Sequence, residues 1–129
     1  TGNDACHIIL RGSSQGPNFD ADSVNEVADQ LKAKGLPEQM MVDCSHGNSK
    51  KDYRNQPGVV SDLCGQIANG SKAVAAVMIE SHLVEGAQKL NSDLDQMTYG
   101  QSVTDQCIGW EATEDVLFEL SQAVQARRG

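Results

Sequence analysis

Four residues able to bind metal ions or anions follow short apolar runs of the chain. Arg11 follows ACHIIL, His46 follows MMVDCS, Glu80 follows AVAAVMI, and Asp105 ends the weaker run SVTD. One imidazole and two carboxylates suit a divalent metal, and mixed nitrogen and oxygen donors favour manganese, iron, cobalt or zinc over calcium. An arginine can bind a phosphate or carboxylate through two parallel hydrogen bonds. The pattern indicates a metal site beside an anion site.

Each of these residues also has a structural interpretation. Polar residues often end strands because the chain is reaching water, which applies to Glu80, and Asp105 equally fits a cap or turn. His46 lies between Ser and Gly, where a surface or a satisfied buried imidazole is the alternative to a ligand. His7 lies inside the first apolar run and fits a satisfied core imidazole, while Cys44 fits a small buried hydrophobe. Only the ordered set of strand ends favours chemistry.

The strands that must position these residues are short. Runs at residues 5–10, 40–42 and 73–79 predict three strands, and a polar loop over 81–101 precedes a weaker fourth at 102–105. The three runs are apolar throughout instead of alternating, which is typical of parallel strands covered on both faces. The carboxyl ends of parallel strands meet at one edge, where α/β proteins place their chemistry.

Two amphipathic helices separate the first three strands, and a third follows the last strand. The first is expected to begin at a capping box of Ser23 and Glu26 and to end before Gly35. The second has Pro57 in its first turn, and the third begins around Thr113. Their apolar stripes are Val24, Val27, Ala28 and Leu31; Val60, Leu63, Cys64 and Ile67; and Val116, Leu117, Leu120 and Val124. The order β-α-β-α-β-loop-β-α predicts one α/β unit.

Three further features favour structural roles over chemistry. His82 is a weaker candidate than His46, and the Lys50–Lys51 pair is more typical of a solvated loop than of a phosphate clamp. Trp110, just before the third helix, is expected to pack against the protein.

Composition limits the class of protein. The 129 residues are 39% hydrophobic and 22% charged, with a formal net charge of -8, as in a soluble globular domain. The acidic balance argues against a nucleic-acid scaffold, and no apolar run approaches a membrane span. The start TGNDACHIIL does not resemble a signal peptide and is interpreted as a cut inside a longer chain. The four cysteines form no CxxC pair and are expected to be free, mostly buried thiols in a reducing cytoplasm.

Four segments carry a resemblance to a known family. GNDACHIILRG, DCSHGNSKKDYRNQ, VMIESHLVEGAQ and YGQSVTDQCIGW together resemble the class I, bacterial-type 3-deoxy-D-arabino-heptulosonate 7-phosphate (DAHP) synthases. The resemblance spans residues 2–128. Family enzymes are longer (β/α)8 TIM barrels, and the resemblance is to their C-terminal portion, about the last three or four βα units.

The resemblance implies a reaction and a site. The family condenses phosphoenolpyruvate with erythrose 4-phosphate to DAHP and phosphate, the first step toward the aromatic amino acids. His46, Glu80 and Asp105 match three ligands of a divalent metal, and Arg11 matches an arginine that binds phosphoenolpyruvate. His46 would also lie near the phosphoenolpyruvate phosphate, and His46 and Asp105, like Arg11, are expected to bind substrate. A cytoplasmic homo-oligomer is expected.

The resemblance also implies what the chain does not contain. The fourth metal ligand of the family, a cysteine, and the substrate-site lysine lie upstream of the matching segments. We therefore expect no synthase activity from the chain alone. An open barrel piece should expose strand edges and an apolar face, so it should pair with a second copy or be marginally stable. Two alternatives are a related enzyme, such as a 3-deoxy-octulosonate 8-phosphate synthase, and a non-catalytic metal- or phosphate-binding piece; YGQSVTDQCIGW favours DAHP synthase.

Overall fold

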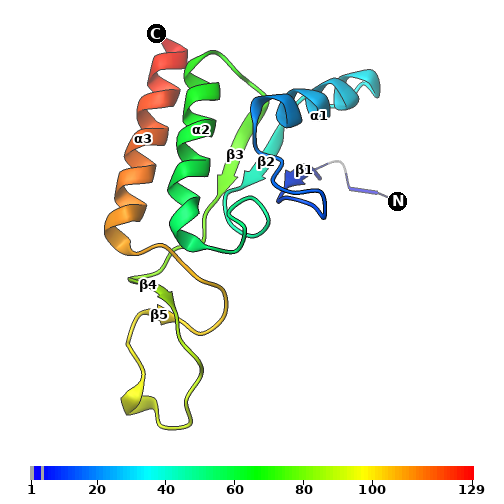
Figure 1. Ribbon diagram of the computed structural model, residues 1–129. Coiled ribbons are helices and arrows are strands. Elements are labelled where there is room, and N and C mark those ends of the chain that lie inside the picture. The colour runs from blue at the N-terminus through cyan, green and yellow to red at the C-terminus, as the bar shows by residue number, and fades with distance from the viewer. Residues whose placement is uncertain (1, 4) are drawn as a thin grey trace.

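Three short parallel strands form the central sheet of the computed structural model, which describes residues 2–3 and 5–129 (Figure 1). In chain order the elements are β1 (Ile8–Leu10), α1 (Ala21–Ala33), β2 (Met40–Asp43), α2 (Gln56–Ala68), β3 (Val74–Met78), β4 (Val84–Ala87), β5 (Gln101–Ser102) and α3 (Trp110–Arg128). Single 3₁₀ turns lie at Tyr53–Asn55 and Leu94–Gln96. The predicted α/β class with parallel strands and helices is confirmed.

The sheet has the order β1-β2-β3, and each neighbouring pair is parallel. Helix α1 connects β1 to β2, and α2 connects β2 to β3, as parallel pairing requires. All three strands therefore end at the same edge, beside Arg11, His46 and Glu80. This topology brings together residues that are far apart in the sequence.

The helices and the strands bury one common core. Buried side chains from all three helices pack with Leu10, Met40, Val42 and Val74 of the strands. Helices α2 and α3 lie side by side along this layer (Figure 1). The core supplies the rigid support from which the strand ends project.

The other face of the sheet is uncovered, so the prediction of strands buried on both faces is wrong. Ile9 is 49% exposed, and Met41 and Ala76 are only partly buried. Ile9 is in register with Met41, and Met41 with Ala76, which places these three residues in one row across the sheet. Side chains alternate along a strand, so this row points away from the face that the helices cover.

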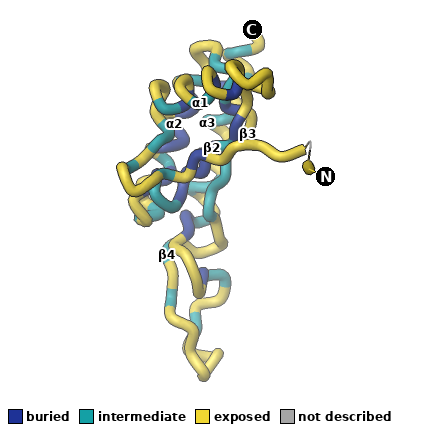
Figure 2. Tube along the Cα trace, turned by 90° about the vertical axis from the view of Figure 1, so that its right-hand side faces the viewer, coloured by how far each residue is buried: buried dark blue, intermediate teal, exposed yellow. Residues whose placement is uncertain are grey.

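The segment 81–107, called the arm below, differs from the predicted loop. Within it β4 pairs with β5, so the predicted strand at 102–105 is shorter, earlier and joined to the arm, not to the main sheet. Figure 2 shows the arm as a largely exposed extension below the buried body. At its end Ile108 forms a parallel bridge with Ser81, which returns the chain to the sheet side.

Helix boundaries and faces depart from the sequence pattern at three points. The side chain of Asp20, not Ser23, caps α1 by accepting from the Ser23 backbone N–H. Helix α3 begins at Trp110, three residues before the predicted Thr113. Trp110 and Leu117 are both 55% exposed, so neither packs as expected.

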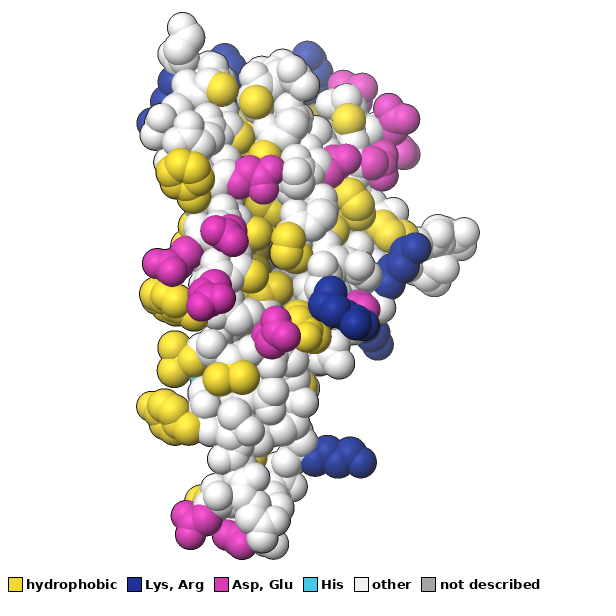
Figure 3. Space-filling model, turned by 60° about the vertical axis from the view of Figure 1, so that its left-hand side comes forward, with side chains coloured by type: hydrophobic (Ala, Val, Ile, Leu, Met, Phe, Trp, Pro, Cys, Tyr) yellow, Lys and Arg dark blue, Asp and Glu magenta, His cyan; other side chains and the backbone are white. Residues whose placement is uncertain are grey.

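The surface of the protein mixes charged and apolar side chains. Acidic side chains are scattered among apolar ones over the face drawn in Figure 3. No helix in the described part of the chain has the length and hydropathy of a membrane span.

Cys44, Cys64 and Cys107 are buried free thiols, as expected, whereas Cys6 is exposed.

Candidate metal centre

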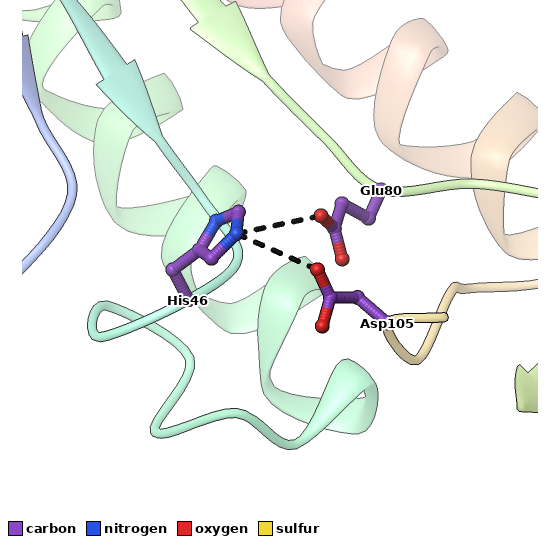
Figure 4. A group of neighbouring side chains, drawn as sticks. All are labelled: His46, Glu80 and Asp105. Carbon is purple, nitrogen blue, oxygen red and sulfur yellow. Dashed lines mark ion pairs between the residues drawn. The ribbon is translucent and has the colours of Figure 1, made fainter.

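His46, Glu80 and Asp105 meet at the carboxyl edge of the sheet, with their side chains pointing toward one another (Figure 4). The Nε2 atom of His46 lies 3.5 Å from Glu80 Oε1 and 3.8 Å from Asp105 Oδ2. One ligand atom from each residue lies within 4.8 Å of the other two. The three predicted metal ligands therefore form one cluster.

His46 occupies the tight loop that follows β2. Its φ of 43° is in the left-handed region, which non-glycine residues rarely adopt. The Nδ1 atom lies 2.8 Å from Oδ2 of Asp43, whose side chain is only 3% exposed. Because a carboxylate only accepts hydrogen bonds, Nδ1 carries the hydrogen, and Nε2 presents its lone pair to the cluster.

The loop that holds His46 is tied to its surroundings by buried polar groups. The side-chain amide of Asn48 donates to the backbone carbonyls of Leu10 and Asp43, at 3.1 and 2.7 Å. The N–H of Gly47 donates to the carbonyl of Arg11 at 3.0 Å. A Cβ on Gly12 would lie 2.6 Å from the carbonyl carbon of Gly47, so only glycine allows this close approach.

Glu80 follows β3, and a neighbouring hydroxyl group orients its carboxylate. Its carboxylate Oε2 accepts a hydrogen bond from the hydroxyl of Ser45 at 3.2 Å. Its side chain is 21% exposed, so it lies at the inner side of the cluster. The hydroxyl of Ser45 orients one oxygen while the other faces His46.

Asp105 reaches the cluster from the arm. Its side chain is 70% exposed, far more than those of His46 and Glu80. It follows β5 in a bend instead of ending a strand, so the strand-end reasoning placed it correctly for the wrong reason. Its position depends on how the arm folds back to Ile108.

Arg11 lies near Asp43 Oδ2, the same oxygen that contacts His46 Nδ1. Its Nε atom is 3.8 Å from Asp43 Oδ2, and its side chain is 59% exposed. Arg11, His46, Glu80, Asp105 and Lys51 line one cavity of about 420 Å³. Lys51 was interpreted as solvated; it is exposed, but it also lines this cavity. Two cations thus share the cavity with the acidic cluster.

The donor set fits a divalent metal. Two atoms that each lie about 2.1 Å from a metal are roughly 3.0–4.2 Å apart. Both distances from His46 Nε2 fall within this range. Two carboxylates facing one imidazole nitrogen favour a cation between them. Nitrogen with two oxygens is compatible with several transition metals and does not select one.

Three other candidates lie outside the cluster. His7 is exposed, so its interpretation as a core imidazole is wrong. His82 is also exposed, and its Nδ1 accepts from the Leu83 N–H at 2.8 Å. Burial raises the pKa of the Cys44 thiol to about 12, which disfavours the thiolate that a metal would bind. Cys44 is therefore the small buried hydrophobe that the sequence favoured.

Asp43 is the site residue that the sequence reasoning missed. The predicted strand ends at Val42 and gives Asp43 no role, whereas Asp43 is the last residue of β2 and lies three positions before His46. A carboxylate directly after an apolar run, three positions before a candidate histidine ligand, is the sequence signal that could have identified it.

Fold and site together define a class: an α/β protein with a candidate divalent metal site at the carboxyl ends of parallel strands. The family model described as the DAHP synthetase I family matches residues 1–118. The chain therefore belongs to the DAHP synthetase I family, which confirms the resemblance.

Individual relatives agree with the family. The chain is 53% identical over 129 residues to the Phe-sensitive phospho-2-dehydro-3-deoxyheptonate aldolase of Escherichia coli, covering 100% of this chain and 36% of that protein. It is 54% identical over 127 residues to the corresponding aldolase of Haemophilus influenzae, covering 98% and 35%. The solved structure of the aldolase from Francisella tularensis aligns with a TM-score of 0.93 at 47% identity, covering 99% and 37%.

The chain thus spans about a third of the length of these relatives. These shares give the extent of the match and not its position along the relatives. The expected C-terminal placement therefore stays a prediction, as do the homo-oligomer and the cytoplasmic location.

Proposed function

We propose that this chain carries three protein ligands of the divalent metal in an enzyme that condenses phosphoenolpyruvate with erythrose 4-phosphate to DAHP and phosphate. The observation that supports it most strongly is the convergence of His46, Glu80 and Asp105 on one point. The names of the relatives are those of aldolases that act on phospho-2-dehydro-3-deoxyheptonate, which favours DAHP over an octulosonate product.

Each residue of the cluster would have its own role in such a reaction. Glu80 and Asp105 supply negative charge to hold the ion, and His46 supplies a neutral nitrogen. A divalent metal bound there would polarise the aldehyde carbonyl of the sugar phosphate toward attack. Asp43 keeps the His46 ring in the required tautomer through its contact with Nδ1.

The cationic side chains of the cavity suit the anionic substrates. Arg11 has its Nε near Asp43, and its side chain is 59% exposed, which leaves its terminal nitrogens open to a carboxylate or phosphate. Lys51 lines the same cavity. Both cations would neutralise substrate charge near the point where the phosphate leaves.

The strands of the sheet fit consecutive strands of a (β/α)8 barrel. Their parallel order β1-β2-β3 and the helices on one face are consistent with this architecture. The row of Ile9, Met41 and Ala76 would then face the barrel interior. Alone, the uncovered face should cause association or marginal stability; a stable monomer in size-exclusion chromatography with light scattering would contradict this expectation.

Binding of phosphoenolpyruvate to the metal-loaded chain tests the proposed function. The experiment titrates Zn²⁺-loaded chain with phosphoenolpyruvate and follows the ³¹P signal of the ligand. We expect saturable broadening with the wild type, a weaker response with Arg11→Ala, and an unchanged response with Arg128→Ala, an exposed control at the far end of α3. No response from the wild type, or equal responses from both variants, would contradict the proposed substrate site.

A further inference from the structure

Gln56 is a fully buried polar residue at the start of α2, with 0% of its surface exposed. Its side-chain amide makes two hydrogen bonds to the main chain of one residue, Glu80. The Nε2 group donates to the Glu80 carbonyl at 3.1 Å, and Oε1 accepts from the Glu80 N–H at 2.9 Å. A buried amide satisfied by one metal-ligand candidate points to a role at the site.

Glu80 needs such partners because it lies beyond the end of β3. The ladder between β2 and β3 ends with the pair Asp43 and Met78, so Glu80 has no strand partner on that side. Gln56 supplies the missing donor and acceptor. On the other side, the N–H of Ile108 also donates to the Glu80 carbonyl, at 2.9 Å. The main chain of Glu80 is therefore held from both sides.

The start of α2 also contacts the loop that carries His46. The side-chain amide of Asn55 donates to the backbone carbonyl of Ser49 at 2.9 Å. Adjacent residues of one helix start thus hold the loop after β2 and the residue after β3. A shift of this helix start would change the separation between His46 Nε2 and the Glu80 carboxylate.

We propose that Gln56 is a positioning residue of the metal centre, which fixes the Glu80 carboxylate at its distance from His46 Nε2 through the Glu80 main chain. The inference rests on the proposed metal site. It assigns Gln56 no contact with the metal. Removal of its amide would leave the Glu80 N–H without that partner and let Glu80 move away from the cluster.

A matched control lies on the same helix. The Nε2 group of Gln66 donates to the backbone carbonyl of Phe19 at 2.9 Å, away from the metal cluster. Gln66→Met therefore removes this bond, together with the bond that Nε2 donates to the Asp62 carboxylate at 2.7 Å, without touching Glu80. A purely structural role predicts that Gln56→Met and Gln66→Met both lower stability and leave the metal affinity of the folded protein unchanged.

The experiment titrates the 129-residue chain and both variants with Co²⁺ and records affinity and the visible absorption spectrum, with urea unfolding measured in parallel. We expect Gln56→Met to weaken Co²⁺ binding by about 10–100-fold, the usual effect of losing an outer partner, and to change the spectrum. Gln66→Met should match the wild type in both. Gln56→Glu, which keeps the shape and the acceptor but loses the donor when ionised, should also weaken binding.

Each result decides the question. Equal Co²⁺ affinity and spectrum in the wild type and Gln56→Met would overturn the inference while leaving the metal site intact. Absence of Co²⁺ binding by the wild type would overturn the proposed function itself. If neither Gln56 variant folds, even in sucrose, Gln56 serves the fold as a whole, which also contradicts a positioning role.

Discussion

The loop after β2 and the arm bring ligands to the same cluster by different physical means. Around His46, buried groups make short contacts: Asp43 holds the ring, and Asn48 ties the backbone of two strands together. Asp105 instead lies on an arm whose tip exposes Leu94 and Tyr99 by 71% and 90%. The site thus combines a preorganised half with an exposed half. We expect the first to determine stability and most of the metal affinity.

The largest difference should appear in stability. Leu63 is fully buried in α2, whereas Leu94 is exposed in the arm. Leu63→Ala should lower the free energy of unfolding by about 2–5 kcal/mol, because it leaves a cavity. Leu94→Ala should change it by no more than about 0.5 kcal/mol. Urea unfolding followed by circular dichroism measures both, and equal losses would show that the arm is part of the core.

His46→Ala should produce the largest loss of metal binding. It removes the nitrogen that faces both carboxylates, so Mn²⁺ affinity should fall by more than the about 10–100-fold that follows loss of an outer partner. His7→Ala is the control, because His7 is exposed and outside the cluster. Titration calorimetry compares the two; unchanged Mn²⁺ affinity in His46→Ala would remove His46 from the site.

The carboxylates of Glu80 and Asp105 should contribute unequally to metal affinity. Ordering an exposed side chain costs about 1–2 kcal/mol, or about tenfold in affinity, and Asp105 is 70% exposed against 21% for Glu80. Glu80→Gln should therefore weaken Mn²⁺ binding about tenfold more than Asp105→Asn. Competition with a fluorescent chelator resolves this difference. The reverse order would mean that the arm, not the body, determines metal affinity.

The smallest effect concerns the thiols. Burial raises the pKa of Cys44 to about 12 and that of Cys64 to about 11, so very little of either is thiolate at pH 8. Cys6 is exposed and should react first with Ellman's reagent. Mass mapping of partly labelled protein should place the fast label on Cys6. Fast labelling of Cys44 would show that the core around this buried residue opens readily.

The sequence predicted the body of the protein better than the arm. Apolar runs and helical spacing located three strands and three helices, because burial in one core determines both patterns. The arm has little burial, so β4 left no apolar signal, and its pairing with β5 depends on contacts across the loop. The apolar pattern alone did not reveal the uncovered sheet face, because Ile9 is apolar whether or not anything covers it. Only the resemblance to part of a longer barrel led us to expect an exposed apolar face.

The sequence also predicted some residues of the candidate site and not others. Position at strand ends correctly placed Arg11, His46 and Glu80 at one edge of the sheet, since parallel strands must end together. Asp105 reaches the cluster from the arm instead of from the end of a sheet strand. The sequence pattern assigned no role to Asp43 or Gln56. A single polar residue inside a strand, or at a helix start, gives no periodic signal of the contact that it makes. Those contacts depend on tertiary distances such as the 2.8 Å between Asp43 and His46.

The central claim is that both halves hold the same ion through His46, Glu80 and Asp105. Anomalous diffraction at the manganese edge, from crystals of the chain grown with Mn²⁺, tests it most directly. We predict one strong peak about 2.0–2.3 Å from His46 Nε2 and from an oxygen of each carboxylate. A well-ordered cluster without such a peak, or a peak bound elsewhere, would contradict the claim.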